Sequence, residues 1–144
     1  MSPDAATIAG WNAASRRWPA GSRPMTFGVM IPISEQSAFG GTPRFSDMAN
    51  LTRIASDVGF DTAWFADHFV FKFPPENIND GVWECWTTMA GVAATTERIS
   101  IGALVACTSF RNPGVIAKMD ESIDEISNGR FILGLGSGWH QPEY

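Results

Sequence analysis

The run ISIGALVA, Ile99–Ala106, is apolar at almost every position. A strand of this kind is buried on both faces, which is typical of a parallel sheet covered by helices. Shorter apolar runs that are rich in strand-forming residues lie on both sides of it, at Thr26–Pro32, Thr62–Ala66 and Phe131–Leu135. We therefore expect four buried strands.

The segments between these strands have the spacing of amphipathic helices. Apolar side chains recur three and four residues apart in each segment: Leu51, Ile54, Ala55 and Val58, then Trp86, Met89, Ala90 and Ala93, then Ile116, Met119, Ile123 and Ile126. Gly59 and Asn128-Gly129 suit helix ends, and Asn112-Pro113 suits a helix start. The order β-α-β-α-β-α-β predicts an α/β fold of parallel βαβ units, either a doubly wound sheet or a barrel.

The composition is that of one globular domain: 144 residues, 44% hydrophobic and 17% charged. No apolar run approaches the roughly 18 residues of a membrane-spanning helix, so we expect no membrane partner. The net charge of −5, with no basic patch, argues against a nucleic-acid partner. Two cysteines, Cys85 and Cys107, are too few for a disulfide framework, so we expect a cytoplasmic protein.

Residues 1–24 differ from the rest of the chain. They are rich in Ala, Ser, Gly and Pro, carry three arginines and one aspartate, and show no sustained period. We interpret them as a disordered extension or an upstream start, with Met25 opening the domain. A transit peptide is the less favoured alternative, and a secretory signal is excluded because no apolar stretch is long enough.

In both candidate folds, function sits at the carboxyl ends of the parallel strands. The residues expected at these ends are Pro32 and Ser34; Asp67, His68 and Phe69; Ala106, Cys107, Thr108 and Ser109; and Gly136, Ser137, Gly138, Trp139 and His140. Since all four ends fall on one rim, these groups could share one pocket.

His68 is the leading candidate for catalysis because imidazole donates and accepts protons near neutral pH. The alternative is that His68 only caps loop backbone. Asp67 points to the opposite side if strand geometry continues, so we expect it to bind a ligand rather than to orient His68. A metal site is not expected, because His68 and His140 show no metal-ligand spacing.

Two further features at the strand ends allow more than one interpretation. Cys107 is expected to pack, or to contact a flat ligand, rather than to act as a nucleophile, since nothing nearby in the sequence activates it. Gly134, Gly136 and Gly138 alternate, which fits either close approach of a ligand or a tight turn. The aromatic side chains of the expected loop Val70–Glu84, with Phe69 just before it, suit the wall of an apolar ligand pocket.

Several stretches together resemble a known family. They are Asp67-His68-Phe69, Glu84–Ala90, Ala93–Ile99, Phe110–Pro113 with Ala117–Met119, and Asp124–Arg130 followed by Gly134–His140. In their order and spacing, from about Thr26 to Tyr144, the chain resembles the luciferase-like monooxygenase family, the flavin-dependent oxidoreductases related to bacterial luciferase.

The resemblance implies a TIM barrel that binds reduced FMN, or in one branch a deazaflavin coenzyme, over the carboxyl ends of the strands. It implies an oxidoreductase in which reduced flavin and O2 oxygenate a small organic substrate. The alternative is a deazaflavin-dependent hydride transfer without O2. Relatives often form dimers, which allows for a homodimer of the full-length enzyme.

The resemblance also implies site residues. His68 matches the position where relatives place a catalytic histidine, and a bulge with a non-prolyl cis peptide in relatives maps to Ala106–Thr108. The end of the fourth strand matches a segment that lines the cofactor site. The expected cofactor-binding set is Asp67, Ala106, Cys107, Thr108, Gly136, Ser137 and Gly138.

A TIM barrel needs roughly 250 residues and eight strands, whereas we expect four strands here. We therefore interpret residues 25–144 as the amino-terminal half of a luciferase-like TIM barrel, with its first and last strands as open edges. The 144-residue chain alone is expected to be inactive, and an inactive fragment, or a half-barrel that pairs with another chain, remains the non-catalytic alternative.

Overall fold

The computed structural model describes residues 25–35, 41–72 and 79–144. The expectations for residues 1–24 lie outside this range. Within it, the strands β1 (Gly28–Met30), β2 (Thr62–Phe65), β5 (Ser100–Ala103) and β7 (Phe131–Ile132) form one sheet in that order. All neighbouring pairs are parallel. This confirms the four expected strands and their parallel arrangement.

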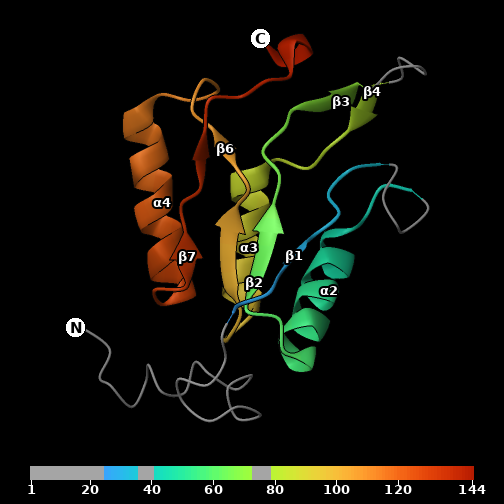
Figure 1. Cartoon of the computed structure of the whole chain (residues 1–144), viewed down its shortest axis with the longest axis vertical. Helices are drawn as coiled ribbons and strands as arrows, with labels where there is room; N and C mark the ends of the chain where they lie inside the picture. Colours follow the sequence, from blue (N-terminus) through green and yellow to red (C-terminus); the bar gives the residue numbers. More distant parts are fainter. Residues whose placement is uncertain (1–24, 36–40, 73–78) are drawn as a thin grey trace.

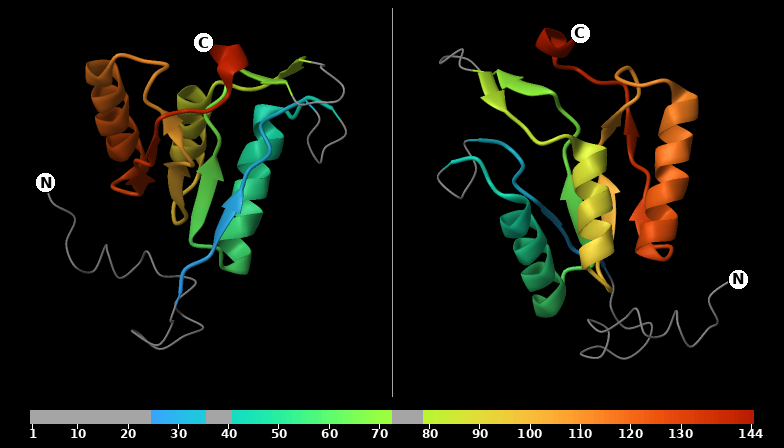
Figure 2. Two further views of the ribbon diagram at one scale, coloured as in Figure 1. Left: turned by 45° about the horizontal axis from the view of Figure 1, so that its top comes forward. Right: turned by 180° about the vertical axis from the view of Figure 1, so that it is seen from behind.

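The helices α2 (Phe45–Val58), α3 (Cys85–Thr95) and α4 (Pro113–Ser127) connect these strands and cover the same face of the sheet (Figures 1 and 2). The strands follow one another in chain order without a reversal, so the arrangement is that of consecutive barrel units rather than of a doubly wound sheet. None of the helices in the described part of the chain is both long and apolar enough to cross a membrane.

Local sequence signals set the helix ends as expected. The side chain of Asn112 accepts the N–H of Gly114 at the start of α4, where Pro113 occupies the first turn. Gly59 ends α2 with φ 102° and Asn128 ends α4 with φ 59°, both in the left-handed region. The side chain of Glu84 caps α3 by accepting two backbone N–H groups.

The hydrophobic core lies between the sheet and the helices, and the expected buried face of α2 is confirmed only in part, because Ala55 is buried and Leu51 packs against the core. Ile54 and Val58 are each 58% exposed, whereas Met48, Thr52 and Ala55 are buried. These three residues form a second stripe with helical spacing. Thr52 joins the core because its hydroxyl donates to the carbonyl oxygen of Met48 at 2.9 Å.

α4 also differs in part from its expected face, because Ile116 and Ile123 are buried while Ile126 is 47% exposed. The expected face of α3 is confirmed at Trp86 and Met89, both buried in the core.

Two of the expected strands are interrupted at the rim. The run Ile99–Ala106 forms β5 and then β6 (Ala106–Cys107), and Phe131–Leu135 forms β7 and then β8 (Leu135–Gly136). β6 and β8 pair with each other in a separate parallel two-stranded sheet. A continuous apolar run carries no mark of such an interruption, so periodicity alone predicts single strands.

The non-prolyl cis peptide bond joins Leu104 and Val105. The expectation that it falls within Ala106–Thr108 is therefore wrong, and the cis bond lies between β5 and β6 instead. The expected loop after β2 is also partly wrong, because it contains an antiparallel hairpin of β3 (Val70–Lys72) and β4 (Asn79–Gly81).

At the amino end of the sheet, Arg130 connects three elements. Its guanidinium is buried and donates to the carbonyl oxygens of Ser127, Ile99, Ala93 and Thr96, at 2.6–2.9 Å. These contacts link the ends of α3 and α4 to the start of β5. Arg130 therefore satisfies backbone carbonyls that would otherwise be buried without donors.

The sheet has two open edges among the described residues, since β1 and β7 each pair on one side only. Met30 on β1 is 45% exposed and Ile132 on β7 is 38% exposed. Uncovered apolar side chains at both edges are what we expect of part of a barrel.

Candidate functional site

The carboxyl ends of the strands meet at a pocket of about 360 Å³. It is lined by Asp67, His68, Leu104, Val105, Cys107, Phe110, Gly136, Ser137, Gly138, Trp139 and Glu143. The structure thus brings together the candidates from the ends of the second, third and fourth expected strands, whereas Ser34 lies elsewhere.

Of the expected cofactor-binding set, two residues lie outside this lining, as do Pro32, Phe69, Ser109 and His140 from the strand ends. Ala106 is fully buried, and its N–H donates to the carbonyl oxygen of Gly134. Thr108 is exposed and donates to the carbonyl oxygen of Gly136 through both its N–H and its hydroxyl. Both residues hold β6 against β8, beside the pocket.

His68 pairs with a carboxylate from the other end of the chain. Its Nδ1 lies 2.8 Å from Oε2 of Glu143, and the Glu143 side chain is only 1% exposed. The other carboxylate oxygen, Oε1, accepts the N–H groups of Phe69 at 2.6 Å and Val70 at 3.2 Å. It is therefore Glu143 that caps the loop backbone here, and the expected alternative role of His68 as a cap is not what the structure contains.

Glu143 is held as a carboxylate. Burial by itself would raise the pKa of its carboxyl, but the hydrogen bonds from His68 and from the N–H groups of Phe69 and Val70 outweigh burial and lower that pKa. Glu143 lies in the short 3₁₀ turn η2 (Gln141–Glu143), close to the start of β3 near the top of the view in Figure 1.

Aromatic rings surround the imidazole of His68. The ring centroid of Phe71 lies 4.6 Å away, and those of Trp139 and His140 each lie 6.1 Å away in edge-on contacts. His68 is therefore held by packing as well as by its contact with Glu143, while 16% of its side chain stays exposed.

Asp67, the neighbour of His68, contacts different partners. Its two carboxylate oxygens lie 2.6 and 3.0 Å from the guanidinium nitrogens of Arg111, and Oδ2 also accepts the N–H of Cys107 at 3.0 Å. Arg111 reaches Glu84 as well, at 2.7 Å. Asp67 thus anchors the segment after β5 and makes no contact that orients His68.

The charges of this cluster support one another. Burial would lower the pKa of Arg111, but its bonds to Asp67 and Glu84 outweigh burial and raise it. Burial would likewise raise the pKa of Glu84, but hydrogen bonds from Thr87, Trp86 and Arg111 outweigh burial and lower it. Arg111 therefore remains a cation with two anionic partners.

Cys107 is a small buried residue in the pocket wall. Its Sγ lies 3.2 Å from the hydroxyl of Tyr144 and 3.9 Å from the carbonyl oxygen of Ser137. No cationic side chain contacts Sγ in the described part of the chain, which fits packing better than nucleophilic attack.

The alternating glycines have reasons within the chain. A Cβ at Gly134 would overlap the carbonyl oxygen of Ala103, and one at Gly136 would overlap the side chain of Val105. Gly138 has φ 81°, as the turn interpretation expects. The glycines thus allow β8 to approach β5 and β6, and Gly136 and Gly138 also leave the pocket wall free of side chains.

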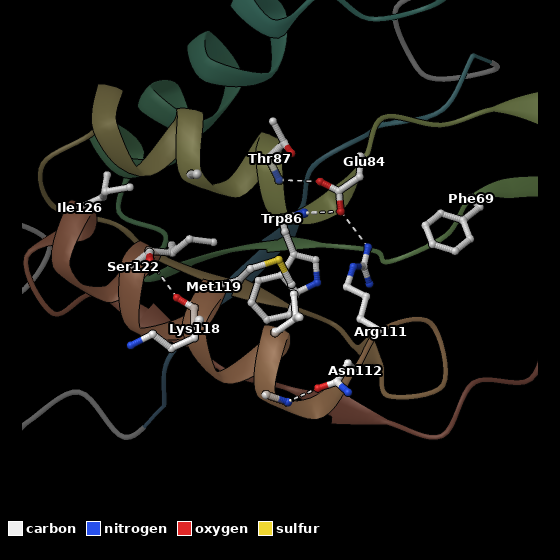
Figure 3. A pocket seen from close by; sticks show the side chains of 14 residues that line it. Phe69, Glu84, Trp86, Thr87, Arg111, Asn112, Lys118, Met119, Ser122 and Ile126 are labelled. Carbon is white, nitrogen blue, oxygen red and sulfur yellow. Dashed lines mark hydrogen bonds and ion pairs between the residues drawn. The ribbon is translucent and has the colours of Figure 1, made fainter.

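A second hollow, a groove of about 890 Å³, lies between α3 and α4 (Figure 3). Trp86, Val115, Met119 and Ile126 give it an apolar floor, and Phe69, Glu84 and Arg111 lie at one end. The aromatic loop residues thus serve different surfaces. Phe69 lines this groove, Phe71 packs on His68, Trp83 donates to the carbonyl oxygen of Pro43, and Phe73 lies outside the described residues.

Sequence reasoning did not assign roles to Glu143 and Arg111. Glu143 is 75 positions from His68, and Arg111 is 44 positions from Asp67. No local pattern marks either pairing, because only the fold brings these side chains together. Among the described residues, no cluster of three or more His, Cys, Asp or Glu side chains is placed to hold a metal ion.

A one-directional series of βα units, with its pocket at the carboxyl ends of the strands, defines the class as TIM-barrel-like. The residues 25–144 match the family model of the luciferase-like monooxygenases. The chain belongs to this family.

Curated relatives include the pyrimidine monooxygenases RutA of Rhizobium rhizogenes and Methylorubrum populi, each 36% identical to this chain. The alignments cover 83% and 87% of this chain but 34% and 35% of the relatives. The chain therefore spans about a third of the length of the curated relatives it matches.

Solved structures agree on the fold. The coenzyme F420-dependent tetrahydromethanopterin reductase of Methanopyrus kandleri is 25% identical, with a TM-score of 0.63 over 81% of this chain and 28% of that one. The oxygenating constituent of 3,6-diketocamphane monooxygenase from Pseudomonas putida, in complex with FMN, is 20% identical, with a TM-score of 0.60 over 81% and 30%.

Proposed function

We propose that this chain forms part of the active site of a flavin-dependent monooxygenase, in which reduced FMN and O2 oxygenate a small organic substrate. The observation that carries the proposal is the pocket at the strand ends, where His68 lies against the buried carboxylate of Glu143. Membership of the luciferase-like monooxygenase family supports this class of reaction.

The residues of the pocket fit the ring system of a flavin. Leu104 and Val105 are 49% and 39% exposed and offer apolar surface, and Gly136 and Gly138 contribute backbone alone to the lining. Ser137 adds a polar group. No lysine or arginine lines this pocket among the described residues, so the lining accounts for the ring but not for the phosphate of FMN.

The bound flavin would supply the reducing electrons that activate O2. The chain's own residues have separate tasks in this proposal. His68 would hold and move a proton, Asp67 fixes the adjacent backbone through Cys107 and Arg111, and Leu104 and Val105 would shield the bound flavin from water. Because the 36% identical relatives are named pyrimidine monooxygenases, a pyrimidine is the first substrate to test.

FMN binding is tested by titrating the 144-residue chain and following the quenching of FMN fluorescence. Leu104→Asp places a charge in the pocket and should weaken binding at least about tenfold. Ile54→Asp is the matched control, because Ile54 is an apolar residue of similar exposure on α2, away from the pocket. Saturable binding that only Leu104→Asp weakens supports the proposal and refutes the alternative of an inert fragment that binds no flavin. Equal effects of both variants would contradict it.

A deazaflavin-dependent hydride transfer is the second candidate, favoured by the 25% identical F420-dependent reductase. Oxygen uptake separates the two functions. The active oxidoreductase, meaning the catalytically competent protein that contains this chain, is mixed with a pyrimidine and either reduced FMN or reduced F420. The O2 concentration is then followed. Substrate-dependent uptake with reduced FMN supports the monooxygenase, whereas turnover with F420 and no uptake supports the hydride transfer.

A further inference from the structure

Both carboxylate oxygens of Glu143 are occupied. Oε1 accepts two backbone N–H groups, from Phe69 and Val70, and Oε2 faces Nδ1 of His68 at 2.8 Å. The side chain is 1% exposed, so water does not compete for these positions. Glu143 is therefore a fixed partner of His68 rather than a mobile surface carboxylate.

The protons at this contact can be assigned by counting donors. An ionised carboxylate only accepts hydrogen bonds, and the two N–H groups on Oε1 together with the lowered pKa keep Glu143 ionised. The partner atom Nδ1 must then carry a proton. In a neutral imidazole that leaves Nε2, on the far side of the ring, without one.

We propose that Glu143 is a positioning residue that fixes His68 in the Nδ1–H tautomer, so that Nε2 is the atom that accepts and returns protons in the pocket. The role of Nε2 in turnover rests on the proposed function, whereas the tautomer does not. The packing of Phe71 and Trp139 on the ring holds the same orientation.

The tautomer is measured by ¹⁵N NMR of the imidazole nitrogens at about pH 8.5, where imidazoles are ordinarily neutral. The chain has two histidines, so the signals that disappear in His68→Gln are those of His68. We expect a protonated Nδ1 and a bare Nε2. A protonated Nε2, or an even mixture of tautomers, overturns the proposal without any variant of Glu143.

Glu143→Gln then tests the cause. The amide oxygen can still accept the N–H groups of Phe69 and Val70, while the amide NH₂ now faces Nδ1 and requires an acceptor there. We expect His68 to change to the Nε2–H tautomer, with the backbone amide signals of β2 and β5 unchanged. A folded Glu143→Gln protein that keeps the original tautomer overturns the proposal. If that variant does not fold, Glu143→Asp retains the carboxylate and must retain the Nδ1–H tautomer.

In the active oxidoreductase, Glu143→Gln should lower kcat by about 10²- to 10⁴-fold with little change in KM, because the proton acceptor is lost but the pocket remains. The double variant with His68→Gln should be no slower than His68→Gln alone, since the two residues act as a unit. Failure to bind FMN would contradict the proposed function and leave the tautomer result standing. An unchanged kcat in Glu143→Gln would overturn the role of Nε2.

Discussion

The charged and titratable side chains at the two ends of the parallel sheet have different kinds of partners. At the amino end, the guanidinium of Arg130 is buried among carbonyl oxygens, and no carboxylate contacts it in the described part of the chain. At the carboxyl end, His68 and Asp67 face carboxylate or guanidinium partners around a pocket. The amino end therefore stabilises the fold, and the carboxyl end provides titratable groups. In TIM barrels, stability residues and active-site residues are usually separated in this way.

The largest expected effect comes from the amino end. Arg130→Met keeps the aliphatic part of the side chain but removes the donors to four buried carbonyl oxygens, those of Ser127, Ile99, Ala93 and Thr96. Each unsatisfied buried group costs about 1–3 kcal/mol, so the free energy of unfolding should fall by about 4 kcal/mol or more. Urea unfolding measures this loss.

The matched control for this substitution is Arg98→Met. Arg98 is exposed and pairs with Asp57, which is also exposed, so its loss should cost less than about 1 kcal/mol. Equal losses from the two variants would remove the distinction between the two ends of the sheet.

His68→Ala should lower turnover strongly and stability little, the opposite of what we expect for Arg130→Met. Loss of a general acid–base group typically lowers turnover by about 10²- to 10⁴-fold. His68 is partly exposed and contributes one side-chain hydrogen bond, so stability and FMN affinity should change much less. Steady-state kinetics of the active oxidoreductase, FMN titration and urea unfolding on the same variant check the three quantities. Unchanged turnover would return His68 to a structural role.

Asp67→Asn should lower the free energy of unfolding less than Arg130→Met and more than His68→Ala. Asp67 is at the carboxyl end, but its partners Arg111 and Cys107 have structural roles. The asparagine oxygen can replace one of the contacts to Arg111 and Cys107, and Glu84 remains as a carboxylate beside Arg111. We expect a loss of about 1.5–3 kcal/mol in the free energy of unfolding, the usual value for a hydrogen bond to a charged group. A large loss of turnover without loss of stability would place Asp67 with His68 instead.

The comparison also explains how far the sequence predicts this structure. The parallel strands and the ends of α2 and α4 follow from short-range signals, such as the run at Ile99 and the caps at Gly59 and Asn112. The break between Leu104 and Val105 leaves no such signal, because both residues continue an apolar run.

In the candidate site, too, some residues are predicted from the sequence and others are not. His68 and Asp67 are found from their place at a strand end, which the order of elements predicts. Their partners Glu143 and Arg111 are not found, since they lie 75 and 44 positions away and only the folded chain pairs them. The candidate residues of a barrel site are thus predictable as single side chains, but not as pairs.

Acidification should have the smallest effect, and at the carboxyl end it acts through Glu143. The pKa of Glu143 is lower in the folded protein than the ordinary glutamate value of about 4.3, so its contribution to stability is present above that value. The contribution is lost as the pH falls below about 4.3 and through the folded pKa. Glu143→Gln should therefore show a shallower fall in the free energy of unfolding over this range, measured by urea titrations at successive pH values.

Glu121→Gln, which removes an exposed partner of Lys118, is the control and should change the slope less because solvent screens that pair. Identical slopes in the wild-type protein and Glu143→Gln would mean that the contact between Glu143 and His68 contributes no pH-dependent stability.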